Sequence, residues 1–184
     1  GPVANVLVRL QLGVEYEVGT PSWADLLHPV ELVRALLVTG VYPTITWAVY
    51  GIVGILIGRA LAGRDETSMR RFGVRIVAGG AVVGAAGWAA SSLILALGGR
   101  DSLSSEYGTD GGPIVDLLLR DSRTGAPIPG SPYWLAAATP HSGTLPDLAV
   151  TIGIACLAIG LCLAVFASSP SLLRRLATPF AAAG

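Results

Sequence analysis

The sequence predicts an all-α integral membrane protein, and two observations support this prediction. The chain of 184 residues is 52% hydrophobic and only 13% charged, whereas soluble domains usually carry about 25% charged residues. It also contains three long apolar stretches, at residues 41–63, 72–99 and 145–168. A helix needs about 20 mostly apolar residues to cross the hydrocarbon core of a bilayer. Each stretch is therefore long enough to span a membrane, and we treat residues 41–184 as the transmembrane region.

Residues 1–40 precede the first span and are expected to lie outside the bilayer. Within them, residues 29–39 mix apolar and charged side chains in a pattern typical of a short amphipathic helix that leads into the first span. Ser22 and Asp25, just before it, are suitable helix caps. Such a helix either lies in the membrane interface or packs on the mouth of the helix bundle, and the sequence leaves both interpretations open.

The first span opens with aromatic residues. Tyr42, Trp47 and Tyr50 are expected near the membrane interface, where amphipathic rings are favoured. Pro43 is tolerated at a helix start because its missing N–H would have no partner there.

Two glycine pairs in the first two spans have a spacing that lets helices approach closely. They are Gly54 with Gly58 and Gly80 with Gly84. We expect them to support helix packing within this protein, with a specific dimer face as the alternative.

Arginine is distributed unevenly along the chain. Residues 59–75, which connect spans one and two, hold seven arginines and two acids together with the region after span three; the rest of the chain holds five arginines and ten acids. Positively charged loops stay in the cytoplasm. The sequence therefore predicts a multi-pass membrane protein, with its N-terminus outside and its C-terminus in the cytoplasm.

The predicted outer loop, residues 100–144, is too long to be a simple connector. Residues 113–120 within it are typical of a short amphipathic helix. The region that leads into span three combines aromatic and polar side chains. It is the part of the chain whose side chains are best suited to bind a substrate. With Trp47 and Tyr42 of the first span, it supplies the predicted substrate-binding residues: Tyr133, Trp134, His141, Ser142, Thr144 and Asp147.

His141 can act as an acid or base because its unperturbed pKa lies near 6.5. Ser142 and Thr144 can donate hydrogen bonds to a sugar or carboxylate, and Asp147 can orient His141. The alternative interpretation is structural, because Ser142, Thr144 and Asp147 are also suitable caps for the third span.

Arginines of the predicted inner loop also admit two interpretations. Arg59, Arg64, Arg70 and Arg71 can bind the phosphates of coenzyme A, because guanidinium groups match phosphate geometry. Arginines in such loops also serve as topology determinants and lipid anchors.

Because two His and two Cys are scattered, the sequence predicts no metal site. The zero net charge predicts no nucleic-acid partner.

Three segments, taken together and in order, carry a resemblance to a known family. They are Gly1-Pro2 with residues 7–9, residues 37–47 followed by Gly58-Arg59, and residues 140–144 with 160–163. In these segments the chain resembles the C-terminal half of bacterial transmembrane proteins similar to heparan-alpha-glucosaminide N-acetyltransferase. We therefore expect it to be a fragment of a larger polytopic domain.

The resemblance implies an acyltransferase that moves an acetyl group from cytoplasmic acetyl-CoA to a glycan or glycolipid acceptor at the outer face. The family's catalytic histidine belongs to the N-terminal half, so no catalytic residue is assigned here. Expected partners are membrane lipid and either the missing N-terminal half or other membrane subunits. The alternative function is that of a non-catalytic structural subunit of a membrane protein complex.

Overall fold

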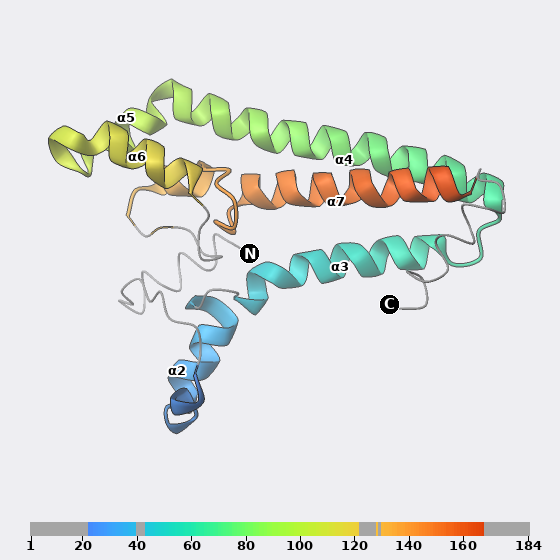
Figure 1. Ribbon diagram of the computed structural model, residues 1–184, viewed down its shortest axis with the longest axis horizontal. Coiled ribbons are helices and arrows are strands. Elements are labelled where there is room, and N and C mark those ends of the chain that lie inside the picture. Colours follow the sequence, from blue (N-terminus) through green and yellow to red (C-terminus); the bar gives the residue numbers. More distant parts are fainter. Residues whose placement is uncertain (1–21, 40–42, 122–127, 129, 168–184) are drawn as a thin grey trace.

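The computed structural model describes residues 22–39, 43–121, 128 and 130–167, and over these residues every regular element is a helix (Figure 1). Three helices within them are long and apolar enough to cross a membrane: Thr44–Leu61, Glu66–Ser105 and Leu145–Phe166. The predicted fold class, an all-α membrane protein with three spans, is confirmed. Most of the predicted outer segment, residues 1–40, lies outside the described residues.

The described chain starts with a helical segment that precedes the first span. It consists of η1 (Trp23–Leu27), α2 (Pro29–Arg34) and η2 (Ala35–Thr39). The backbone N–H of Ser22 donates to the Asp25 carboxylate, which caps η1, and Pro29 stands at a position where a helix needs no N–H donor. The helix predicted at residues 29–39 is confirmed.

The three long helices run antiparallel to their neighbours in sequence (Figure 1). They are α3 (Thr44–Leu61), α4 (Glu66–Ile94) and α7 (Leu145–Phe166). The second helix starts at Glu66 instead of residue 72, because Asp65 accepts a hydrogen bond of 3.1 Å from the backbone of Ser68 and so caps it. The predicted inner loop, 59–75, is thereby corrected: residues 62–65 connect the helices, and Arg70 and Arg71 lie on α4.

Helices α4 and α7 pack so closely that their backbones touch. Gly73, Gly80 and Gly87 recur every seven residues on α4, and Gly153 and Gly160 have the same spacing on α7. A Cβ atom added at Gly80 would lie 2.7 Å from the carbonyl oxygen of Gly153, and one added at Gly73 would lie 2.7 Å from that of Gly160. A seven-residue repeat keeps one seam of each helix facing its partner. The seam is therefore lined by glycine, as in other closely approaching membrane helices.

The two predicted glycine pairs have different surroundings. Gly80 and Gly84 both face Gly153 of α7, so their predicted role in packing within the protein is confirmed. Gly54 and Gly58 of α3 have open space where a side chain would be. Helix α3 is joined to α7 mainly through side chains near its beginning, described below.

A layer of short helices lies at the end of the bundle where α3 and α7 begin, which we call the α6 end (Figure 1). Helix α4 passes through the π-helical turn η3 (Leu95–Gly99), where Gly98 has a φ of 111°, into α5 (Arg100–Ser105). Then follow η4 (Gly108–Asp110), α6 (Gly111–Arg120) and η5 (Pro132–Ala136). The helix predicted at 113–120 is confirmed, and the predicted outer loop, 100–144, is largely helical where it is described.

The layer at the α6 end has its own small core. Its buried members come from α5, α6, η5 and the residue after η5: Leu103, Val115, Trp134 and Ala137. Helices α5 and α6 approach so closely that a Cβ atom at Gly111 would overlap the carbonyl oxygen of Ser104. This core fixes the segment from which the chain enters α7.

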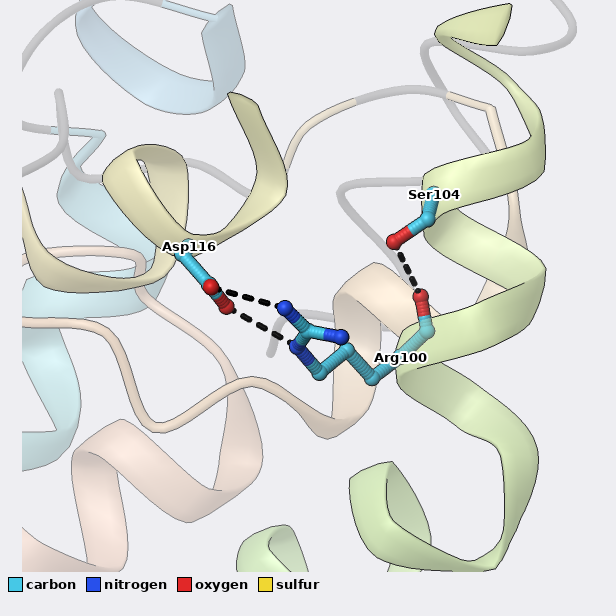
Figure 2. Close-up of polar contacts among 3 residues, drawn as sticks. All are labelled: Arg100, Ser104 and Asp116. Atoms are coloured by element: carbon cyan, nitrogen blue, oxygen red, sulfur yellow. Dashed lines mark hydrogen bonds and ion pairs between the residues drawn. The ribbon is translucent and has the colours of Figure 1, made fainter. Parts of the chain in front are cut away.

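An ion pair joins α5 to α6 at the surface of this layer (Figure 2). Arg100 donates from Nε to Oδ1 of Asp116 over 2.9 Å and from a terminal guanidinium nitrogen to Oδ2 over 2.7 Å. The hydrogen bonds from Arg100 lower the pKa of Asp116 below its usual value of 3.8. A bidentate pair of this kind fixes orientation as well as adding attraction.

Acidification is expected to remove the contribution of this ion pair. Because the folded-state pKa of Asp116 lies below 3.8, the pair stabilises the protein above that pH and stops doing so as the pH falls through the folded-state pKa. The effect is small because both side chains are well exposed. Thermal unfolding of Asp116→Asn and of the parent protein across this range checks it. The two curves should differ at neutral pH and converge at low pH; a constant difference would contradict the prediction.

Candidate functional site

A cavity of about 180 Å³ lies between the first halves of α3 and α7, at the α6 end of the bundle. Its walls combine aromatic, acidic and hydroxyl-bearing side chains with one imidazole. The lining residues are Thr46, Trp47, Tyr50, His141, Gly143, Asp147, Leu148 and Thr151. Three predicted site residues, Trp47, His141 and Asp147, are thus brought together.

His141 is held in place by a tight turn just before α7. The backbone N–H of Ser142 donates to the carbonyl of Thr139 over 3.1 Å, which closes the turn. His141 has a φ of 60° and Gly143 one of 65°. Histidine is among the few residue types, with asparagine and aspartate, that adopt this left-handed region with some frequency. The backbone therefore restricts which residues can replace His141.

Thr144 caps α7, as the structural interpretation of this segment predicted. Its Oγ1 accepts a hydrogen bond of 3.2 Å from the backbone N–H of Asp147 and donates one of 2.5 Å to the carbonyl of Ala137. Ser142 Oγ lies 3.2 Å from Thr144 Oγ1, and both side chains are buried. The two hydroxyls thus tie the turn to the residue after η5.

Asp147 belongs to both the turn and the cavity. Its Oδ2 accepts a hydrogen bond of 2.9 Å from the backbone N–H of Gly143, and the residue is almost fully buried while lining the cavity. Burial of a carboxylate is costly unless polar groups compensate it. The turn supplies one such group, and the cavity gives the carboxylate access to a ligand.

Aromatic rings and one hydrogen bond connect α3 to this turn. The ring of Trp47 is stacked with that of His141, with centroids 6.2 Å apart, and lies 5.3 Å from that of Tyr50. The hydroxyls of Tyr50 and Thr151 are 2.6 Å apart, and Thr151 donates to the carbonyl of Asp147 over 2.8 Å. The cavity therefore lies beside the contacts that hold α3 against α7.

Thr46 supplies a buried hydroxyl at the cavity wall. Its side chain is only 1% exposed, and within the described part of the chain its Oγ1 has no hydrogen-bond partner. Buried polar groups are nearly always hydrogen-bonded to protein or water. A ligand or water in the cavity would satisfy this hydroxyl, so the site suits a polar molecule with a face that can stack on Trp47.

The other predicted substrate-binding residues lie elsewhere. Trp134 is buried in the core of the layer at the α6 end, and the ring of Tyr133 lies against Gly99. Tyr42 falls outside the described residues. Tyr50 and Thr151 were not among the predicted site residues, although each lies one helical turn further along from a predicted one, Trp47 and Asp147.

The predicted cofactor-binding arginines are exposed at the opposite end of the bundle, which we call the arginine end. Arg59 is in the last turn of α3, while Arg70 and Arg71 are in the first turns of α4. Arg64 donates from Nε to the carbonyl of Ala60 over 2.5 Å, and its guanidinium lies 4.6 Å from the centre of the Phe72 ring. The short connection 62–65 keeps all four side chains at this end.

In comparisons with protein-family models, curated proteins and solved structures, the chain matches none of them. The resemblance to membrane acyltransferases therefore stays a prediction from the three sequence segments.

Proposed function

We propose that this chain is part of a membrane acyltransferase that moves an acetyl group from acetyl-CoA to a glycan or glycolipid acceptor. The observation that carries the proposal is the cavity between α3 and α7, which gathers His141, Asp147, Trp47 and Tyr50. An aromatic face with a carboxylate, an imidazole and hydroxyls around it suits a sugar, which offers hydroxyl groups and a flat apolar face. The three ordered segments in which the chain resembles the acyltransferase family support the same proposal.

The residues divide between two roles in this proposal. At the α6 end, Trp47 stacks on the acceptor, while Asp147, Tyr50 and His141 hydrogen-bond its polar groups. At the arginine end, Arg59, Arg70 and Arg71 bind the phosphates of acetyl-CoA, since charge-assisted bonds from arginine to phosphate are strong and directional. The group that activates the acceptor belongs to the remainder of the enzyme.

The proposal also sets the location and orientation of the protein. The α6 end faces the outside of a bacterial plasma membrane, and the arginine end faces the cytoplasm, because positively charged loops stay inside. Labelling of intact cells with a membrane-impermeant maleimide tests this on variants without the native cysteines. Thr109→Cys should be labelled and Arg70→Cys should react only after lysis. The reverse pattern would overturn the orientation.

Replacement of His141 by asparagine tests the acceptor site. His141→Asn keeps a side chain that tolerates the left-handed backbone but removes the imidazole. We expect kcat/KM for acetyl transfer by the full-length protein to fall about tenfold, which corresponds to one lost hydrogen bond. Transfer of labelled acetyl groups from acetyl-CoA to membrane glycans measures it.

The matched control is His28→Asn, which changes the other histidine, an exposed residue outside the cavity. It should leave the rate unchanged. Equal rates for the two variants would remove His141 from the acceptor site, and no acetyl transfer by the full-length protein would refute the enzyme assignment.

One observation favours the alternative, a non-catalytic membrane subunit. On α3, the positions of Gly51, Gly54 and Gly58 have open space beside them, so this helix can accept a close neighbour. Purification in mild detergent distinguishes the two functions. A stoichiometric complex with other membrane proteins that transfers no acetyl group would favour the subunit, whereas an active homo-oligomer would favour the enzyme.

A further inference from the structure

An apolar stripe on the segment before α3 is left uncovered. Trp23 is 88% exposed, and Leu27 and Val30 are each 81% exposed. Leu26, Val33 and Leu37 are exposed as well. The surfaces of water-soluble proteins rarely expose so many large apolar side chains together.

These side chains recur at helical spacing. Positions 26 and 27 follow position 23 of η1 by three and four residues, and positions 30, 33 and 37 of α2 and η2 are three and four residues apart, so each group lies along one side of its helix. Glu31 follows Val30 directly and is also exposed, which places it about 100° further around the helix. The segment therefore has one apolar side and a polar flank.

The position of the segment identifies what covers the stripe. It leaves the bundle at the α6 end and runs crosswise to the long helices (Figure 1). Thr44, the first residue of α3, donates from Oγ1 to the carbonyl of Leu36 over 2.9 Å, which ties the segment to the start of a spanning helix. The start of a spanning helix marks the level of the membrane interface. A segment that runs crosswise at that level lies next to the lipid headgroups, so lipid is available to cover the stripe.

We propose that residues 22–39 form an in-plane membrane helix, with the stripe inserted between the lipid headgroups and the upper acyl chains. Trp23 stands at one end of the stripe, and tryptophan is favoured at this depth. The polar flank with Asp25 and Glu31 faces water. This decides between the two interpretations left open by the sequence, and it depends neither on acyl transfer nor on which side of the membrane the α6 end faces.

Site-directed spin labelling tests the proposal in the full-length protein, reconstituted in vesicles of phosphatidylethanolamine and phosphatidylglycerol. Cys156 and Cys162 are free thiols and are first replaced by alanine. Labels are then placed at Val30→Cys on the stripe and Glu31→Cys beside it, with Leu27→Cys as a second stripe position should Val30→Cys not fold. Collision rates with oxygen, which partitions into lipid, and with a water-soluble nickel chelate are measured at each label.

The ratio of oxygen to nickel collisions should be several-fold higher at Val30 and Leu27 than at Glu31. Equal ratios, with high nickel collision rates at all positions, would place the helix in water and overturn the proposal. Low collision rates with both reagents at the stripe would also overturn it, because they would show a protein surface covering the stripe, such as a second copy of this chain.

Discussion

Replacement of Gly80 by alanine is expected to destabilise the protein by about 1–3 kcal/mol, the usual cost of forcing extra atoms into a packed interface. The new methyl group would lie 2.7 Å from both the carbonyl oxygen of Gly153 and the Cβ atom of Cys156. The carbonyl belongs to a helix backbone and cannot rotate away, so α4 and α7 must separate. Separation would also weaken the neighbouring glycine contacts along the same seam.

Gly79 provides a control on the next residue of the same helix. It has open space where a Cβ atom would be, and alanine is more favourable than glycine inside a helix by up to about 1 kcal/mol. Gly79→Ala should therefore leave stability unchanged or raise it slightly. The free energy of unfolding, measured in mixed micelles of mild detergent and dodecyl sulfate, tests both variants.

The reciprocal change on α7 sharpens this test. Gly153→Ala should destabilise to a similar extent, because its methyl group would lie 2.7 Å from the carbonyl oxygen of Gly80. Once the helices have separated, a second methyl group costs less, so the double variant should lose less stability than the sum of the single changes. Equal stability of Gly80→Ala and Gly79→Ala would contradict the close packing of α4 on α7.

Apolar length predicted the three spans and the start of α7, but it missed the start of α4. The hydropathy of residues 72–99 marks the part of the second helix that suits lipid, whereas the helix itself extends back to Glu66 because Asp65 caps it. A helix cap depends on local hydrogen bonds, and hydropathy averaged over a window of residues does not detect them. Similarly, glycine spacing identified Gly80 with Gly84 and Gly54 with Gly58 alike, although only the first pair faces another helix. The spacing of glycines shows that they share one side of a helix. It does not show which other helix, if any, packs against that side.

For the site, the sequence was most informative where chain proximity and spatial proximity coincide. His141 and Asp147 are close in sequence, and the turn before α7 keeps them close in space. Trp134 is also near in sequence, yet it turns into the core of the layer at the α6 end. Tyr50 reaches the cavity from a distant part of the chain through Thr151. Such a long-range contact depends on how α3 is set against α7, and no local pattern in the sequence reveals it.

Replacement of Thr144 by valine is expected to cost about 2 kcal/mol, since it removes a helix cap and leaves a buried group without its partner. Valine has nearly the same shape as threonine, so packing around this fully buried position is retained. The backbone N–H of Asp147 loses its acceptor, and the carbonyl of Ala137 loses its 2.5 Å donor. The turn that carries His141 should then loosen at these two attachments, while the bond from Gly143 to Asp147 remains.

Thr144→Ser is the matched control because it keeps the hydroxyl and removes only a methyl group. Measured in the same micelles, it should lie much closer to the parent protein than Thr144→Val. The valine variant should also bring the Trp47 indole into a more water-exposed setting, since the stacked ring of His141 is no longer held in place. Equal stability of the valine and serine variants would mean that the methyl group, and not the hydroxyl, matters at this position, which would contradict the role of Thr144 as the cap that positions the turn.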